Sequence, residues 1–333
     1  MIPRIPDPEH TPAWQQALAG AVKSADELLG LLDIDPAHPG VRPLLNDFPV
    51  RVPHSFIRRM VKGDIHDPLL RQVLMVADEA QLTAGYNHDP LEEQQAMATP
   101  GLLHKYHGRA LLTATGACAV HCRYCFRRHF PYGQANPASD DWIAALDYLS
   151  RHTDIAEIIL SGGDPLSLTD RRLGSLACRL AAIPHLQTLR IHTRIPVVLP
   201  ERINPELLEW LGVQRLQVVM VIHSNHPNEI DAEVHQAMRS LKRAGVTLLN
   251  QSVLLRGVND NAATLVALSQ ALMAAGVLPY YLHQMDKVQG AAHFEVADSM
   301  ARQLMERVHA ALPGYLVPRL VRELPGHPGK LAL

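Results

Sequence analysis

The sequence has little of what secreted, membrane-spanning or nucleic-acid-binding proteins carry. Only four of its 333 residues are cysteine, which is too few for a disulfide framework and suits a reducing compartment. No apolar run reaches the roughly 18 residues of a membrane span. The first residues, MIPRIPDPEHTP, contain no apolar stretch typical of a signal peptide. We therefore expect a cytoplasmic protein.

Positive and negative charges are also nearly equal in number. The formal net charge is −2, so no overall field attracts nucleic acid or an anionic membrane, and we expect neither as a partner. Hydrophobic residues make up 47% of the chain and charged residues 19%, which is ordinary for a globular enzyme. A chain of this length can bury one large core and carry an appendage.

The first hundred residues predict a helical and irregular region without a catalytic motif. Segments 11–32, 53–63 and 67–80 have helical apolar spacing, and the first is interrupted by Gly20 and Gly30. We expect this N-terminal region, 1–100, to cover the main domain.

From about residue 108, strands and helices alternate. Six such units in a row imply a parallel sheet with right-handed crossovers, whose chemistry collects where the strands end. The fold class is therefore α/β, a partial (β/α)6 barrel over residues 101–312 with a C-terminal segment, 313–333. The predicted strands are 109–115, 156–164, 188–194, 216–223, 246–255 and 277–284, with amphipathic helices between them and a last helix at 295–312.

The most informative stretch is ACAVHCRYCF, residues 117–126. It places Cys118, Cys122 and Cys125 in a Cys-x3-Cys-x2-Cys spacing. Three thiolates this close can hold three irons of a cubane iron–sulfur cluster, whose fourth iron is usually held by another cysteine. The remaining cysteine, Cys178, is more than fifty residues away. The spacing therefore favours a cluster with one iron open to a small molecule.

A zinc site is the alternative. The three cysteines lie near His121 and His129, and together they could form a Cys3His site. A zinc knuckle usually has a second Cys or His pair further along at regular spacing, and none is evident here.

Two other stretches each have an ordinary and a functional interpretation. SGGDPL (161–166) is typical of a turn, but its glycines would also let the backbone approach a ligand closely. PGHPGKLAL (325–333) contains Lys330. This lysine is either an exposed surface residue or an accessible amine for a Schiff base with pyridoxal phosphate (PLP).

Together with the cysteine spacing, these motifs resemble the lysine 2,3-aminomutase family of radical S-adenosylmethionine (SAM) enzymes. The resemblance runs from about residue 100 to the end and more weakly before it. It is closest to the short bacterial form that makes (R)-β-lysine for modification of elongation factor P, and it implies a TIM-like radical SAM barrel. The motifs are KYHGRALL, CAVHCRYCFRR, LSGGDPL, RIPVVLPERI, HSNHPNEI, NQSVLLRGVND, YYLHQMD and PGHPGK.

The resemblance also implies roles for individual residues. A [4Fe–4S] cluster is expected on Cys118, Cys122 and Cys125, with SAM on the open iron, and covalent PLP is expected on Lys330. Further contacts are implied with PLP for Tyr106, Arg109 and Gln251; with SAM for Tyr124, Ser161, Gly162, Gly163, Asp164 and His223; and with substrate for Arg127 (carboxylate), Asp286 and Glu323 (ε-ammonium).

The implied enzyme is an isomerase that moves the amino group of free L-lysine from C2 to C3. Its expected partners are an external electron donor and, indirectly, elongation factor P through a β-lysine ligase. An oligomer is possible, but the resemblance predicts no particular oligomeric state. Two alternatives stay open: a radical SAM aminomutase for arginine or glutamate, and a non-enzymatic metal or cluster protein.

The three substrate residues also have ordinary interpretations, because most charged side chains are simply exposed. Glu323 in addition departs from the family pattern, which has the shorter Asp there. In the ordinary interpretations Arg127 is a solvated charge beside Arg128, Asp286 pairs with Lys287, and Glu323 pairs with Arg322.

Overall fold

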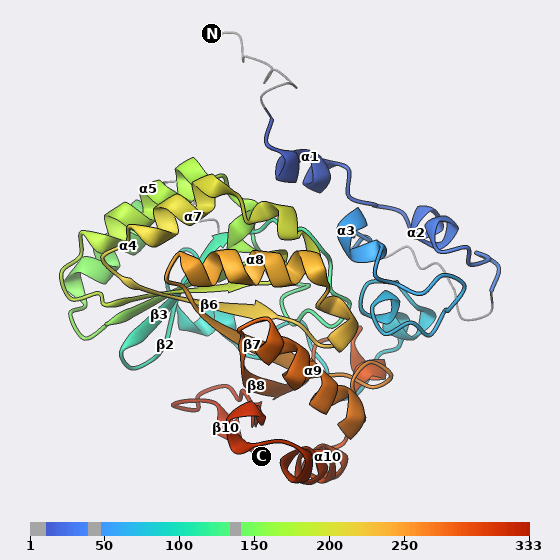
Figure 1. Cartoon of the computed structure of the whole chain (residues 1–333). Coiled ribbons are helices and arrows are strands. Elements are labelled where there is room, and N and C mark those ends of the chain that lie inside the picture. Colours follow the sequence, from blue (N-terminus) through green and yellow to red (C-terminus); the bar gives the residue numbers. More distant parts are fainter. Residues whose placement is uncertain (1–10, 39–47, 134–140) are drawn as a thin grey trace.

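The computed structural model describes residues 11–38, 48–133 and 141–333, and its centre is a ten-stranded sheet (Figure 1). The strands lie side by side in the order in which they occur in the chain. They are β1 (Met97–Thr99), β2 (Leu102–Tyr106), β3 (Arg109–Thr115), β4 (Glu157–Gly162), β5 (Thr188–Thr193), β6 (Gln217–His223), β7 (Thr247–Leu254), β8 (Leu278–Gln284), β9 (Arg319–Arg322) and β10 (Leu331–Ala332).

Strands β3 to β9 run parallel, and helices connect most of them. The six predicted strands correspond to β3–β8, so the prediction of an α/β fold with an open, TIM-like parallel barrel is confirmed. In Figure 1, α4, α5, α7 and α8 lie above strands β3 and β6. The connecting helices are α4 (Ile143–Arg151), α5 (Asp170–Ala181), α6 (Ile195–Val198), α7 (Pro205–Gly212), α8 (Ala232–Arg243), α9 (Ala262–Ala274) and α10 (Asp298–Ala311).

The sheet continues beyond the predicted strands at both edges. β1 and β2 add an antiparallel pair in front of β3. At the other edge β9 joins β8 in parallel, and β10 turns back antiparallel to β9. Strands β1, β9 and β10 were not predicted because they are too short to show a period of two, and β2 does not alternate between buried and exposed residues. The β9–β10 hairpin brings Lys330, just before β10, back to Glu323, just after β9.

The N-terminal region contains three short helices, α1 (Ala13–Ala19), α2 (Ala25–Leu31) and α3 (His54–Ile57). Gly20 ends α1, as predicted, whereas Gly30 lies within α2 and does not interrupt it. In the described parts of the chain, no helix is long and apolar enough to cross a membrane.

The prediction of one helix over residues 67–80 is wrong. The segment forms two short 3-10 helices, Leu70–Gln72 and Ala77–Ala80, joined by a turn and a bend. The carbonyl of Gln72 accepts a hydrogen bond from the backbone N–H of Arg123 at 2.9 Å. The contact with the cysteine loop, residues 117–126, therefore occupies the Gln72 carbonyl. In a longer helix this carbonyl would accept a hydrogen bond from the next turn.

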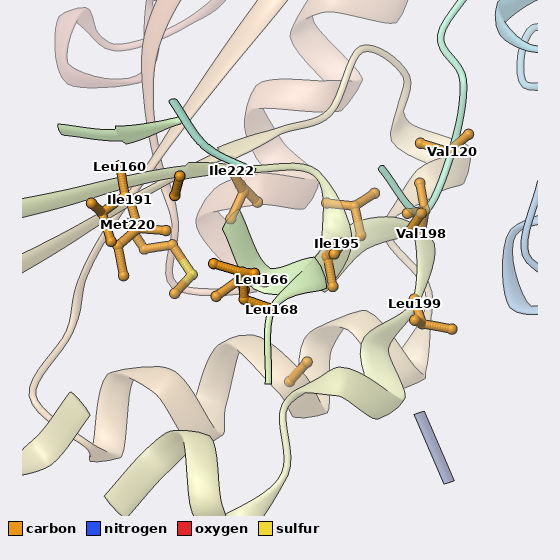
Figure 2. Close-up of a cluster of buried hydrophobic side chains, with 14 of the residues drawn as sticks. Val120, Leu160, Leu166, Leu168, Ile191, Ile195, Val198, Leu199, Met220 and Ile222 are labelled. Carbon is orange, nitrogen blue, oxygen red and sulfur yellow. The ribbon is translucent and has the colours of Figure 1, made fainter. Parts of the chain in front are cut away.

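One large hydrophobic cluster joins the N-terminal region to the barrel. It includes Leu28 and Val73 as well as strand and helix residues. Figure 2 shows part of it, with Ile191 and Met220 from neighbouring strands close to Leu166 of the loop after β4. Full burial of such a side chain contributes roughly 1.5–3 kcal/mol, so this contact area holds the N-terminal segment firmly on the barrel.

Candidate active site

A cavity of about 220 Å³ lies on the face of the sheet opposite the helices. Successive side chains of a strand point to opposite faces. In β4, Ile158 and Leu160 pack in the helix-covered core, whereas Ile159 and Ser161 line the cavity. The strand alternation therefore separates a structural face from a face available for ligands.

Nine of the predicted site residues line this cavity, although they come from distant parts of the sequence. The other seven lie outside its lining, at the end of β4 and in the loops that follow β3 and β4. The lining residues are Tyr106, Arg109, Arg127, Ser161, His223, Gln251, Asp286, Glu323 and Lys330, and the others are Cys118, Cys122, Tyr124, Cys125, Gly162, Gly163 and Asp164.

Lys330 and Glu323 form an ion pair in the cavity. Lys330 Nζ donates to Glu323 Oε2 at 2.7 Å, and Lys105 Nζ lies 3.5 Å from the other carboxylate oxygen. Burial raises the pKa of Glu323, but the lysine charges and the hydrogen bonds to its carboxylate outweigh burial and lower that pKa to about 2. Arg322 pairs instead with Asp298 at 2.5 Å, so the ordinary interpretation of Glu323 is wrong.

Asp286 lines the cavity just after β8, and no hydrogen bond to its carboxylate is found within the described residues. Burial, reinforced by the negative charge of Glu323, raises the pKa of Asp286 to about 7. The neighbouring Lys287 pairs with Glu295 instead, with 3.6 Å between Lys287 Nζ and Glu295 Oε1, so the suggested Asp286–Lys287 pair is wrong. A cation that binds beside Asp286 would therefore lower this pKa and favour the ionised carboxylate.

Arg127 is only 6% exposed, so its interpretation as a solvated charge is wrong. Its Nε and Nη2 donate to the two carboxylate oxygens of Glu93 at 2.6 and 2.7 Å, and its Nη1 donates to Ser161 Oγ at 2.9 Å. Burial lowers the pKa of Arg127, but the charge of Glu93 outweighs burial and raises it. The guanidinium is thus fixed in the cavity wall.

The loop after β3 brings the three cysteine thiols close to one another. Burial, with the other two cysteines contributing, raises the pKa of Cys118, and burial together with Cys122 raises that of Cys125 to about 11. Arg194 Nη1 donates to Cys122 Sγ at 2.8 Å. Metal ligation requires thiolates, so a positively charged metal centre that binds here would displace the protons of the three thiols.

Gly162 and Gly163 let the loop after β4 pack directly against the cysteine loop. A Cβ on Gly163 would lie 2.3 Å from the carbonyl oxygen of Ala117, and one on Gly162 would lie 2.5 Å from that of Thr115. The N–H groups of Gly163 and Asp164 donate to these two carbonyls, Thr115 and Ala117 respectively, each at 2.7 Å. The backbone N–H groups of Gly163 and Asp164 are therefore already used within the protein.

Asp164 and Tyr124 also make contacts within the protein. The Asp164 carboxylate accepts hydrogen bonds from Thr193 Oγ1 and from the backbone N–H of Arg194, both at 2.7 Å. The Tyr124 hydroxyl accepts from Asn225 Nδ2 at 2.6 Å. Asp164 thus ties the loop after β4 to the end of β5, and Tyr124 ties the cysteine region to the loop after β6.

The two histidines of the zinc hypothesis bind backbone carbonyls. His121 Nδ1 lies 2.8 Å from the Pro49 oxygen, and His129 Nε2 lies 3.2 Å from the Gln289 oxygen. Across the three described ranges, no group of three His, Cys, Asp or Glu side chains is arranged to hold a single metal ion. The geometry thus gives the Cys3His hypothesis no support.

The predicted site does not include several polar cavity residues, among them Glu93, Lys105, His192 and His283. Burial lowers the pKa of both histidines well below its usual value, so they are neutral near pH 7. Lys105 could have been found, because it precedes Tyr106 in the KYHGRALL motif. Glu93 gave no signal beyond an acidic pair in a region where no motif was recognised.

Comparisons with known proteins show the family to which the chain belongs. The family model of the radical SAM superfamily matches residues 112–268, which include the cysteine loop. An L-lysine 2,3-aminomutase of Escherichia coli (strain K12) is 54% identical over 322 residues, which are 96% of this chain and 94% of that protein. The chain belongs to the L-lysine 2,3-aminomutase family. An L-lysine 2,3-aminomutase of Haemophilus influenzae is 52% identical over 283 residues, 85% of this chain and 84% of that protein.

Membership of the L-lysine 2,3-aminomutase family confirms the family predicted from the motifs. The radical SAM domain implies a [4Fe–4S] cluster and SAM, and the crowded thiols on the loop after β3 fit such a cluster. Among solved structures, a radical SAM methyltransferase from Sphaerobacter thermophilus has a TM-score of 0.45 at 16% identity, covering 66% of this chain and 68% of that chain.

Proposed function

We propose that this protein is an isomerase that converts free L-lysine into β-lysine by moving the amino group from C2 to C3. The observation that carries the proposal is the cavity, which brings together the guanidinium of Arg127, the carboxyl groups of Asp286 and Glu323, and the accessible amine of Lys330. The relatives named L-lysine 2,3-aminomutase support the same reaction.

Charges of opposite sign in one cavity suit lysine, which carries a carboxylate near one end and an ammonium at the other. Arg127 would bind the α-carboxylate, since a guanidinium can present two parallel N–H groups. Asp286 and Glu323 would bind the ε-ammonium. Two carboxyl groups repel a glutamate side chain and suit a terminal ammonium better than the broader guanidinium of arginine, so neither alternative substrate is favoured.

The cysteine loop would hold the cluster. Its thiolates on Cys118, Cys122 and Cys125 would each bind one iron, while Arg194 offsets negative charge at Cys122. The cluster and SAM together supply the radical that removes a hydrogen from the substrate. The protein contributes by positioning the substrate and excluding water and oxygen. Direct contacts of SAM remain predictions for Tyr124, Ser161, Gly162, Gly163, Asp164 and His223.

Lys330 would bind PLP covalently, and PLP supplies the group that holds the migrating nitrogen. The side chain of Lys330 is 22% exposed, so it is shielded and yet accessible from the cavity. Tyr106, Arg109 and Gln251 would bind the ring and the phosphate of PLP. The Arg109 guanidinium already lies 4.6 Å from the centre of the Tyr106 ring, which supports placing both against the same cofactor.

The proposal extends to the setting of the reaction. We propose that the product is (R)-β-lysine, that a β-lysine ligase attaches it to elongation factor P, and that an external donor reduces the cluster. The enzyme would work in the cytoplasm.

The substrate test compares free and protein-bound lysine. Anaerobically purified protein is incubated with SAM, PLP and a reductant, together with either free L-lysine or intact elongation factor P, and β-lysine is measured by chiral chromatography. We expect (R)-β-lysine from the free amino acid alone, because a peptide blocks the α-amino and α-carboxylate groups. Rearrangement only of the protein-bound lysine would overturn the proposed substrate.

The cluster assignment has its own test. Iron, acid-labile sulfide and the visible spectrum are measured for wild type and Cys122→Ala. We expect the variant to lose reductive SAM cleavage. Colourless wild-type protein with one zinc and no sulfide, or cleavage that survives in Cys122→Ala, would contradict the radical chemistry proposed here.

A further inference from the structure

We propose that Glu93 is a positioning residue that holds Arg127 in the orientation required by the substrate carboxylate. This inference rests on the proposed function and adds to it a residue outside the recognised motifs. Glu93 lies in a short 3-10 helix, Glu93–Ala96, immediately before β1. It therefore reaches the cavity from the N-terminal region.

The hydrogen bonds of Arg127 leave one edge of its guanidinium available. A guanidinium has five N–H groups. Glu93 accepts from Nε and from Nη2, at 2.6 and 2.7 Å, and Ser161 accepts from Nη1 at 2.9 Å. The two remaining N–H groups belong to Nη1 and Nη2, the nitrogens that can bind a second carboxylate.

The surroundings restrict Arg127 further. The centres of the Phe126 and Phe130 rings lie 4.9 and 5.8 Å from its guanidinium carbon, so aromatic rings contact the cation. Glu93 is 4% exposed and Arg127 is 6% exposed, so water competes little for their hydrogen bonds. Without Glu93, the guanidinium would lose both contacts that fix its side edge.

The charges around Glu93 are also suited to an incoming anion. Lys105 Nζ lies 3.5 Å from Glu93 Oε1, so Glu93 has two cations beside it, Arg127 and Lys105. Glu323, which also contacts Lys105, is paired with Lys330 at 2.7 Å. This corner of the cavity thus keeps positive charge that a substrate carboxylate can match.

The test measures binding without catalysis. The PLP-loaded protein, without SAM, is titrated by calorimetry with L-lysine and with L-lysinamide, which has both amines but no carboxylate. Glu93→Gln should raise the Kd for lysine by about tenfold or more, because it weakens a charged hydrogen-bond network. The Kd for lysinamide should change by less than about twofold. Glu93→Asp should recover part of the lysine affinity, and the exposed neighbour Glu92→Gln should change neither value.

Other results overturn the inference. If Glu93→Gln weakens lysine and lysinamide equally, Glu93 only supports the structure. If it weakens neither, Arg127 does not depend on it. If Glu93→Gln fails to fold, the same two titrations are made with Glu93→Asp, because this variant keeps the charge but shortens the reach of the side chain. A wild type that binds no lysine would overturn the proposed function as well, whereas unchanged lysine binding in Glu93→Gln overturns this inference alone.

Discussion

The cysteine loop meets the loop after β4 through backbone contacts, whereas the neighbouring cavity is lined by ion pairs. Backbone N–H groups of Gly163 and Asp164 fix the loop through hydrogen bonds to its carbonyls. In the cavity, Arg127 is held by Glu93, which is distant in the sequence, and Lys330 is held by Glu323 at the other end of the connection between β9 and β10. Backbone contacts respond to added atoms, whereas ion pairs respond to protonation. Changes of shape should therefore damage the loop, and changes of charge should damage the cavity.

The largest effect is expected from Gly163→Ala. The new methyl group would lie 2.3 Å from the Ala117 carbonyl oxygen, and a backbone atom cannot easily move aside. Overpacking of this kind costs roughly 1–3 kcal/mol, and the cysteine loop would absorb it. We expect folded protein that has lost most of its iron, sulfide and SAM cleavage. Gly133→Ala is the matched control, because no atom of the described residues lies within 4 Å of its Cβ position. Full cluster content in Gly163→Ala would contradict the steric account of the loop.

Lys330→Ala tests the cavity by removing a charge and the proposed site of PLP attachment. We expect borohydride to fix PLP to the peptide containing Lys330 in the wild type and to no peptide in the variant. The cluster should remain, because the cysteine loop makes its contacts elsewhere. Peptide mapping and iron analysis of the same samples check both points, with the exposed Lys287→Ala as control. A label on another lysine would move the cofactor site.

Asp286→Asn removes one carboxyl group with little change in shape. A charged hydrogen bond contributes roughly 1.5–3 kcal/mol, so lysine turnover should fall at least about tenfold. Cluster and PLP content should match the wild type. Steady-state assays together with both cofactor measurements check this. Undiminished turnover would remove Asp286 from the site and leave the proposed substrate standing.

The same variant should gain stability at high pH. The pKa of Asp286 is raised to about 7 from an ordinary value of 3.8. The folded state therefore binds more protons than the unfolded state between these values, and its stability falls as pH rises through this window. Unliganded Asp286→Asn should thus be more stable than wild type at pH 8, with a smaller difference at pH 5. Thermal unfolding at both pH values checks this, and a difference independent of pH would argue against the raised pKa.

The smallest effect is expected from Cys178→Ala. Cys178 is exposed on α5 and does not belong to the cysteine loop. SAM cleavage, iron content and lysine turnover should all equal those of the wild type within error. Loss of the cluster in this variant would show that the fourth cysteine takes part in holding it.

The sequence predicted the central barrel well because its strands are long apolar segments separated by amphipathic helices. It failed where tertiary contacts decide the conformation. The segment around Gln72 has helical spacing, yet its carbonyl binds the backbone of Arg123 and the helix does not continue. Strand β10 has two residues, and such a short segment carries no periodic pattern.

Nine of the sixteen site residues that were predicted from the motifs line one cavity. Sequence could not show that Glu93 binds Arg127, because the two residues are 34 positions apart and no pattern links them. Nor could it show that Asp164 satisfies backbone donors of the loop after β5. Pairings of this kind depend on the folded arrangement of loops, which local residue patterns do not contain.

The β9–β10 hairpin gives the proposed cofactor site a lower local stability than the rest of the barrel. β10 pairs with β9 at only two positions, Leu331 with Arg322 and Ala332 with Val321, and Leu331 is 39% exposed. Segments with so few buried contacts open locally at a small fraction of the global unfolding free energy. We therefore expect Lys330 to leave the cavity while β3 to β8 stay folded. A ligand that holds Lys330 in the cavity stabilises the closed hairpin by the same free energy that the hairpin contributes to its binding, so amide-exchange protection of the hairpin reports occupancy of the site.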